Sequence, residues 1–166
     1  SLINSEDIKS DKEIDIKSPH SSSILGKKYF ADEKISETAI NNLKEYSSKW
    51  KKFSIEKKVE IFLKFADLIE ENTNDIIEIC AKESGKSIKN SIAEIREAID
   101  FCRYYSKEAL NLFQTQTLKG PTGELNQYRM SGKGLSFVIS PWNFPVAIFV
   151  GQTVAALITG NVVITK

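Results

Sequence analysis

The apolar positions of residues 29–119 follow the spacing of amphipathic helices. They recur every three or four residues over Glu33–Trp50 and again after Ser54, and a shorter helical segment begins at Asn74. Serine at position 54 is typical of a helix N-cap, and Gly85 is typical of the position at which a helix ends. The pattern therefore predicts a succession of helices through this part of the chain.

The longest predicted helix opens at Ser87 and extends to about Phe113. Its apolar residues recur at intervals of 4, 3, 4 and 3, which places them on one face of the helix. Glu97 lies on the opposite face, where a charged side chain is ordinarily solvated. The predicted inward stripe consists of Ile88, Ile92, Ile95, Ile99 and Cys102.

Residues 1–28 show charged and polar runs in place of helical spacing. The run SEDIKSDKEIDIKS is dense in charge, and SPHSSS is a polar turn cluster. We predict a poorly ordered N-terminal arm, with a short strand around Ile14–Ile16 as its regular element.

Glycine and proline end the helical pattern and introduce strands. Gly120–Gly123 (GPTG) interrupts the helix, and both Glu124–Met130 and Leu135–Ile139 are typical of strands. The segment Ser131–Gly134 between them contains two glycines, which is a hairpin signal. Residues 120–139 are therefore predicted to form a β-hairpin or flap.

The last segment, residues 135–166, has the pattern of a βαβ unit. The strand Leu135–Ile139 is followed by Val146–Ile158, which is apolar almost all round, and then by the β-branched run Val162–Thr165. Pro145 is suited to the first position of the helix. The predicted fold class is α/β, in which N-terminal helices and a β-hairpin lead into the first βαβ unit of a sheet that is incomplete within this chain.

The two strands of a βαβ unit are parallel, so the segments at their carboxyl ends meet at one edge of the sheet. Here that edge receives the loop Ser140–Pro145 and the strand-end residue Lys166. It would bring together the amide of Asn143, the indole of Trp142 and an ammonium group. The helix that follows the loop has a positively polarised N-terminus, which suits an anion. We therefore expect a ligand site at this edge.

Composition narrows the class of partner. Apolar residues make up 41% and charged residues 27%, and 23 Lys and Arg face 22 Asp and Glu. This balance gives no electrostatic reason to expect nucleic acid or an anionic membrane. The longest apolar stretch, Phe144–Leu157, is too short for a transmembrane segment, and no secretory signal is evident. Two cysteines do not make a disulfide framework, so we expect a cytoplasmic protein.

Other kinds of reactive site have little support in the sequence. Cys80 and Cys102 lie on apolar helix faces and are interpreted as inert core cysteines. His20 is the one histidine and falls in a predicted loop, so no histidine-based triad is indicated. The residues offer no cluster of metal ligands.

The motif ISPWNFP followed by GNVVITK, within Gly134–Lys166, resembles the cofactor-binding opening of the aldehyde dehydrogenase superfamily. A weaker likeness begins at Glu33. AKESGKSI, AEIREAIDFCRYY and GPTGELNQYR are most similar to the glutamate-semialdehyde (1-pyrroline-5-carboxylate) dehydrogenase module of bifunctional proline-utilisation proteins, over its N-terminal part. The resemblance implies a Rossmann-like domain, NAD as cofactor, and oxidation of L-glutamate γ-semialdehyde to glutamate in proline catabolism.

The same resemblance assigns roles to individual residues. Asn143 would donate its side-chain amide to the oxyanion that forms when a cysteine attacks the aldehyde. Glu97 and Phe144 would lie near the substrate. Plainer readings stay open: Asn143 could cap the following helix, and the lysine at the strand end could simply be solvated. The implied cofactor cleft consists of Ile139, Ser140, Pro141, Trp142 and Lys166.

The family's nucleophilic cysteine and glutamate base lie downstream of the matched region. We therefore expect these 166 residues alone to lack dehydrogenase activity and to hold half of the NAD cleft. Two alternatives remain: a non-catalytic remnant or interaction module from a split gene, and a dehydrogenase for another semialdehyde. Because the chain begins with Ser1 and not with Met, we expect a processed product, a tag remnant or an excerpt of a longer chain. The apolar edge at Val162–Thr165 and the flap predict a homo-oligomer.

Overall fold

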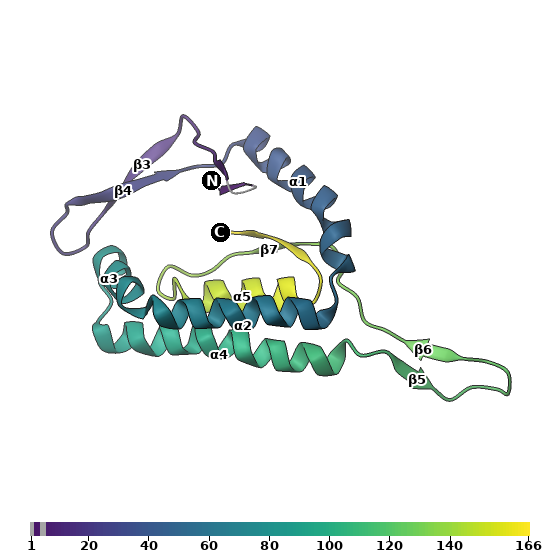
Figure 1. Ribbon diagram of the computed structural model, residues 1–166. Coiled ribbons are helices and arrows are strands. Elements are labelled where there is room, and N and C mark those ends of the chain that lie inside the picture. The colour runs from purple at the N-terminus through teal and green to yellow at the C-terminus, as the bar shows by residue number, and fades with distance from the viewer. Residues whose placement is uncertain (1, 4–5) are drawn as a thin grey trace.

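The computed structural model describes residues 2–3 and 6–166, and helices account for most of residues 33–112 (Figure 1). The predicted helix ends are confirmed. The Ser54 hydroxyl accepts a hydrogen bond from a first-turn amide at 3.2 Å, Ser87 caps the longest helix in the same way, and Gly85 has a φ of 67°. These N-terminal helices are α1 (Glu33–Lys52), α2 (Ile55–Glu71), α3 (Thr73–Ser84) and α4 (Ile88–Leu112).

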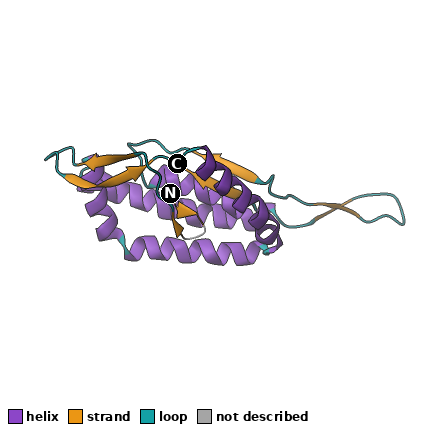
Figure 2. Cartoon of the chain, turned by 90° about the horizontal axis from the view of Figure 1, so that it is seen from above, coloured by secondary structure: helices purple, strands orange, loops and turns teal. Residues whose placement is uncertain are grey.

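The predicted βαβ unit is confirmed. The strands β7 (Leu135–Val138) and β8 (Val162–Thr165) pair in parallel, with Leu135 opposite Val162, and α5 (Ala147–Ile158) connects them. Helix α5 lies between two layers, with α2 and α4 on one side and the β7–β8 sheet on the other (Figures 1 and 2). This position explains why the helix is apolar almost all round.

Helices α4 and α5 approach closely because α5 presents small residues to its neighbour. A Cβ atom at Gly151 would lie 2.8 Å from Cδ2 of Phe101, closer than carbon atoms ordinarily pack. Around this contact Ala98, Cys102 and Val154 are buried. The absence of a side chain at residue 151 is therefore what allows the two helices to meet.

Substituting Gly151→Val should lower the free energy of unfolding by about 1–3 kcal/mol, because the added methyl groups overpack the contact with Phe101. Valine has a slightly better helix propensity than glycine, so the loss would arise from packing. Urea-induced unfolding measures the difference. The matched control is Gln152→Val, on the exposed neighbouring position of α5. Equal stability of the two variants would contradict the packing argument.

The predicted inward stripe of α4 is only partly correct. Ile88 is 65% exposed and Ile92 is 41% exposed, although both were assigned to the core face. The buried face is rotated toward small and polar residues because α5 packs closely along it. The buried positions are Ser91, Glu94, Ile95, Ala98, Ile99, Cys102, Ser106 and Ala109.

The hairpin predicted within residues 120–139 is wrong in its pairing. The strand β6 (Asn126–Tyr128) pairs antiparallel with β5 (Gln116–Leu118), and the GPTG segment supplies the reversal. Residues 135–138 instead pair with β8. The β5–β6 ribbon extends away from the body of the molecule (Figure 1). The glycine-containing segment 131–134 is held against the main body, where a Cβ at Gly132 would lie 2.5 Å from the carbonyl carbon of Gly160.

The N-terminal residues also differ from their prediction. Where the sequence predicts a poorly ordered arm over residues 1–28, the described residues form two antiparallel pairs of strands. Their charges are compensated across strands, since Lys27 forms an ion pair with Glu13 and lowers the pKa of that carboxyl group. The expected strand around Ile14–Ile16 lies within β3. The pairs are β1 (Leu2–Ile3) with β2 (Glu6–Asp7), and β3 (Glu13–Lys17) with β4 (Ile24–Tyr29).

Candidate functional site

The site lies where the carboxyl ends of β7 and β8 meet. The backbone amide of Ser140 donates to the carbonyl of Lys166 at 3.0 Å, and its hydroxyl group is 3.3 Å from the same oxygen. The amide of Lys166 donates to Val138 at 3.0 Å. The parallel ladder therefore continues one step past both strands, and the structure brings the loop after β7 and the lysine after β8 to one edge, as predicted.

The segment Ser140–Val146, which we call the Asn143 loop, exposes residues 141–145, while its two end residues are half-buried. Trp142 is 81% exposed and so does not have the packing role that its size would allow. Asn143 is also exposed, and its side chain makes no hydrogen bond with any described residue. The loop includes a turn in which the Phe144 amide lies 3.4 Å from the carbonyl of Pro141. The amide of Asn143 is thus available to a ligand.

Asn143 does not cap α5. The helix begins at Ala147, two residues after Pro145, and its N-cap position, Val146, has no side-chain cap. The carboxylate of Glu94 takes that place: its Oε1 accepts from the amides of Val146 at 2.7 Å and Ala147 at 3.1 Å. The positive end of α5 is therefore satisfied by a buried carboxylate from α4, which corrects the expectation that it would receive a ligand anion.

Glu94 is a residue that the sequence reasoning missed. It is 2% exposed, and its second oxygen forms an ion pair with Lys86, whose side chain is 12% exposed. A pattern of apolar residues does not reveal a buried charge beside the stripe. The available signal was the set of small residues Ser91, Ala98 and Cys102, because they mark the face of α4 on which Glu94 also lies.

Lys86 connects this buried pair to the Asn143 loop. Its Nζ donates to the backbone carbonyl of Asn143 at 2.9 Å and lies 4.5 Å from the centre of the Phe144 ring. A cation over an aromatic face is attracted by the ring's negative quadrupole. The ammonium group therefore contacts Glu94, Asn143 and Phe144 at once.

Comparison with known proteins assigns the fold that carries this site. The model of the aldehyde dehydrogenase family matches residues 7–166. The chain belongs to the aldehyde dehydrogenase family. The resemblance inferred from the two motifs of Gly134–Lys166 is confirmed at this level.

Two named relatives show which of the aldehyde dehydrogenases this chain is similar to. The 1-pyrroline-5-carboxylate dehydrogenase of Bacillus subtilis (strain 168) is 35% identical over 166 residues, which cover 99% of this chain and 32% of that protein. That of Geobacillus sp. (strain WCH70) is 32% identical over the same shares. The chain thus spans about a third of the length of these curated relatives.

Solved structures show similarity to the same kind of aldehyde dehydrogenase. Proline utilization A (PutA) from Bdellovibrio bacteriovorus, inactivated by N-propargylglycine, superimposes with a TM-score of 0.95 at 34% identity, over 99% of this chain and 17% of that one. A 1-pyrroline-5-carboxylate dehydrogenase gives a TM-score of 0.94 at 30% identity, over 99% and 32%. The chain therefore has the N-terminal part of the aldehyde dehydrogenase fold.

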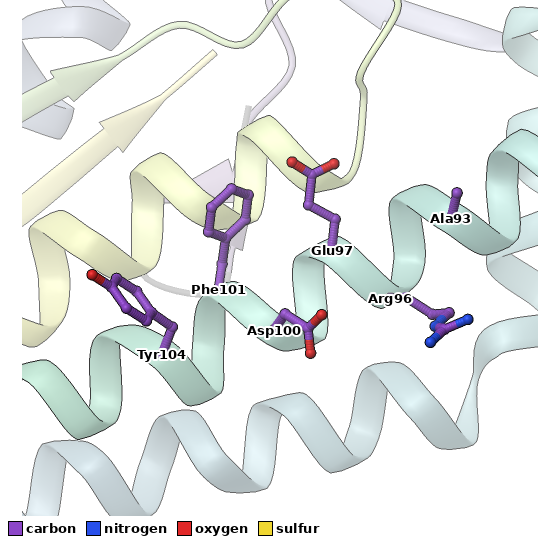
Figure 3. Close-up of a pocket in the computed structure, with 6 residues that line it drawn as sticks. All are labelled: Ala93, Arg96, Glu97, Asp100, Phe101 and Tyr104. Atoms are coloured by element: carbon purple, nitrogen blue, oxygen red, sulfur yellow. The ribbon is translucent and has the colours of Figure 1, made fainter.

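Glu97 does not share a pocket with the residues of the Asn143 loop. Figure 3 shows its carboxylate extending from α4 toward the first turn of α5, beside Phe101. It lines a shallow pocket of 540 Å³ whose walls come from α4 alone. Because neither Asn143 nor Phe144 contributes to that pocket, the substrate role of Glu97 stays a prediction. The lining consists of Ala93, Arg96, Glu97, Asp100, Phe101 and Tyr104.

The two cysteines of the chain have the surroundings of inert thiols. Both are buried, and burial raises the pKa of each thiol above its ordinary value, to about 11 for Cys102. For Cys80 the charge of Glu94 acts in the same direction. A nucleophile needs the opposite arrangement, because the thiolate is the reactive form. This agrees with the interpretation that both are core residues.

Two further properties of the described residues bear on the class of site. Among residues 2–3 and 6–166, no helix has the length and apolar character to cross a membrane. The same residues contain no group of three or more His, Cys, Asp or Glu placed to hold a metal ion.

Proposed function

We propose that this chain forms the oxyanion donor and one rim of the NAD cleft in an enzyme that oxidises L-glutamate γ-semialdehyde to glutamate. The observation that carries the proposal is the exposed Asn143 side chain, which has no described intramolecular partner and lies on a loop tied to the backbone of Lys166. The names of the 1-pyrroline-5-carboxylate dehydrogenase and PutA relatives support the choice of substrate.

The chemistry of an amide suits the proposed role of Asn143. Attack of a thiolate on an aldehyde turns the carbonyl oxygen into an anion, and a neutral N–H donor stabilises it without competing as a base. The donor must be in place before the charge develops. An amide on a loop whose backbone is held at both ends meets that requirement better than one on a mobile segment.

The residues at the sheet edge fit the proposed cofactor. Ile139 is 56% exposed and Trp142 projects outward. Lys166, which follows β8, offers an ammonium group to the hydroxyl groups of the cofactor. We propose that these residues, with Ser140 and Pro141, hold the adenosine side of NAD. When bound, NAD supplies the hydride acceptor. The chain's own part is to orient it against the edge of the sheet.

We propose that the nucleophile of the family mechanism comes from outside these 166 residues, because Cys80 and Cys102 are buried with raised pKa values. The resemblance to the family places the glutamate base outside them as well. An activity of this chain alone would depend on these two cysteines. We expect both to be dispensable for the activity of the whole enzyme. We also propose a cytoplasmic location, which suits two unpaired thiols.

The native polypeptide that contains this chain should convert L-glutamate γ-semialdehyde and NAD⁺ to glutamate and NADH. Replacing Cys80 and Cys102 together by serine should change kcat by less than about twofold, because neither thiol forms a reactive thiolate. The rate of NADH production measures the activity of the native polypeptide and of the double variant. Succinic semialdehyde is the matched comparison substrate. Turnover of that aldehyde alone would move the proposal to another semialdehyde, and loss of activity in a folded double variant would contradict the placement of the nucleophile.

A second candidate, an interaction module without catalysis, is favoured by one observation. The β5–β6 ribbon extends away from the body and offers a surface for contacts with another protein or another copy of the chain (Figure 2). Intact-mass measurement in the source cell separates the two. A native species near 18.7 kDa supports the module, and roughly three times that mass supports the dehydrogenase. For the dehydrogenase we propose a homo-oligomer that covers the apolar sheet edges.

A further inference from the structure

Three sets of contacts hold the Asn143 loop, and two of them come from one ion pair. At the start of the loop, Ser140 is bonded to the backbone of Lys166. In the middle, the ammonium of Lys86 donates to the carbonyl of Asn143 at 2.9 Å. At the end, Glu94 accepts from the amides of Val146 and Ala147. Apart from the turn contact between Phe144 and Pro141, the middle of the loop has no backbone hydrogen bond with another described residue, so Lys86 and Glu94 supply the main restraint.

The position of Lys86 is itself fixed. It follows the left-handed Gly85, and its amide lies 3.4 Å from the carbonyl of Cys80. Pro19 and His20 from the β3–β4 turn fill the space beside Gly85, with Pro19 Cγ 3.3 Å from where a Cβ would stand. With its side chain 12% exposed and its charge paired to Glu94, Lys86 has little freedom to leave the loop.

Lys86 contacts Asn143, the residue proposed as the oxyanion donor. It binds the carbonyl of Asn143, so it restrains the peptide plane between Asn143 and Phe144, which includes the Cα atom that carries the Asn143 side chain. The same ammonium lies over the ring of Phe144, the next residue. Glu94 fixes the start of α5, which limits how far the end of the loop can move.

We propose that Lys86 and Glu94 are positioning residues that aim the Asn143 amide at the reacting carbonyl oxygen. Neither touches the substrate; both act through the backbone of the Asn143 loop. This proposal rests on the proposed function, because the aim of the amide matters only if Asn143 is the oxyanion donor. A displacement of about 1 Å at such a donor can cost about 100-fold in rate.

The test uses the native polypeptide with L-glutamate γ-semialdehyde and NAD⁺. Lys86→Met should lower kcat by about 10- to 100-fold, with KM values for both substrates changed by less than about threefold. Lys86→Arg should recover part of the loss, because it keeps a positive charge and donors near Glu94. The matched control is Lys82→Met, which removes the exposed ion pair with Glu78 on α3 and should leave kcat unchanged.

A double-mutant cycle with Asn143→Ala distinguishes positioning from a general structural role. Once the amide is gone, Lys86→Met should lower kcat by no more than about threefold further. Losses that multiply fully would overturn the positioning role while leaving Asn143 as the donor. An unchanged kcat in Asn143→Ala alone would instead remove the oxyanion role, and the positioning role with it. Thermal unfolding is followed in parallel, and if Lys86→Met is unfolded at the assay temperature, Lys86→Arg replaces it in the cycle.

Discussion

Asn143→Ala is expected to lower kcat by a factor of about 10²–10³, the usual effect of removing one oxyanion donor. The KM for L-glutamate γ-semialdehyde should change little, because the donor acts on charge that develops in the transition state. The backbone carbonyl that Lys86 binds is retained in alanine, so the loop keeps its restraint. Steady-state kinetics of the native polypeptide measure both constants.

The same substitution should leave stability unchanged, which makes the prediction specific. The Asn143 side chain is exposed and has no hydrogen bond with a described residue, so its removal costs the fold no contact. The matched control is Gln152→Ala, which deletes another exposed side-chain amide from the following helix. If Asn143→Ala and Gln152→Ala had the same kcat, Asn143 would not be the donor. A large fall in the unfolding temperature of Asn143→Ala would indicate a structural role.

The features predicted correctly from sequence are those whose causes lie within a few residues. Ser54 and Ser87 cap helices through amides in the next turn, and Gly85 ends one by its own φ. The β7–α5–β8 unit follows from the length and apolar pattern of consecutive segments. The meeting of Ser140 and Lys166 follows in turn, because parallel strands place both at one edge.

The features missed are those that depend on contacts between residues distant in the sequence. β7 is adjacent to β6 in sequence, but it pairs in parallel with β8, and both of these strands contact α5. The N-terminal hairpin depends on cross-strand charge pairs such as Glu13–Lys27, which a count of charges in one run does not reveal. The pattern of apolar residues along one chain does not show which of two possible partner strands would bury more surface.

Glu94 is the clearest case of this limit. The amide of Val146 that it binds lies 52 residues away in the sequence, and an isolated glutamate between isoleucine and alanine is indistinguishable from a solvated one. Sequence reasoning therefore found the residue that projects from the loop, Asn143, and overlooked the pair that holds the loop. In general, an exposed polar residue on a predicted loop is easier to recognise from sequence than the buried charges that support the loop.

Glu94→Leu is expected to lower the free energy of unfolding by about 3–5 kcal/mol, because it leaves Lys86 without its buried partner. It also removes the acceptor for the amides of Val146 and Ala147, each of which costs about 1–3 kcal/mol when buried and unsatisfied. Glu94→Gln keeps one carbonyl acceptor and should lose less. Urea-induced unfolding of the purified wild-type protein and of both variants measures these differences.

The double variant Glu94→Leu with Lys86→Met separates the two contributions. Removing both charges should restore part of the stability, since an apolar pair replaces a broken ion pair, but the amides at the start of α5 remain without an acceptor. Recovery is therefore expected to be incomplete. The control is Glu78→Leu, which breaks the exposed ion pair with Lys82 and should leave stability unchanged. A loss in Glu94→Leu no greater than in that control would show that the buried carboxylate does not hold α5 in place, and with it that the Asn143 loop is restrained by Ser140 and Lys86 alone.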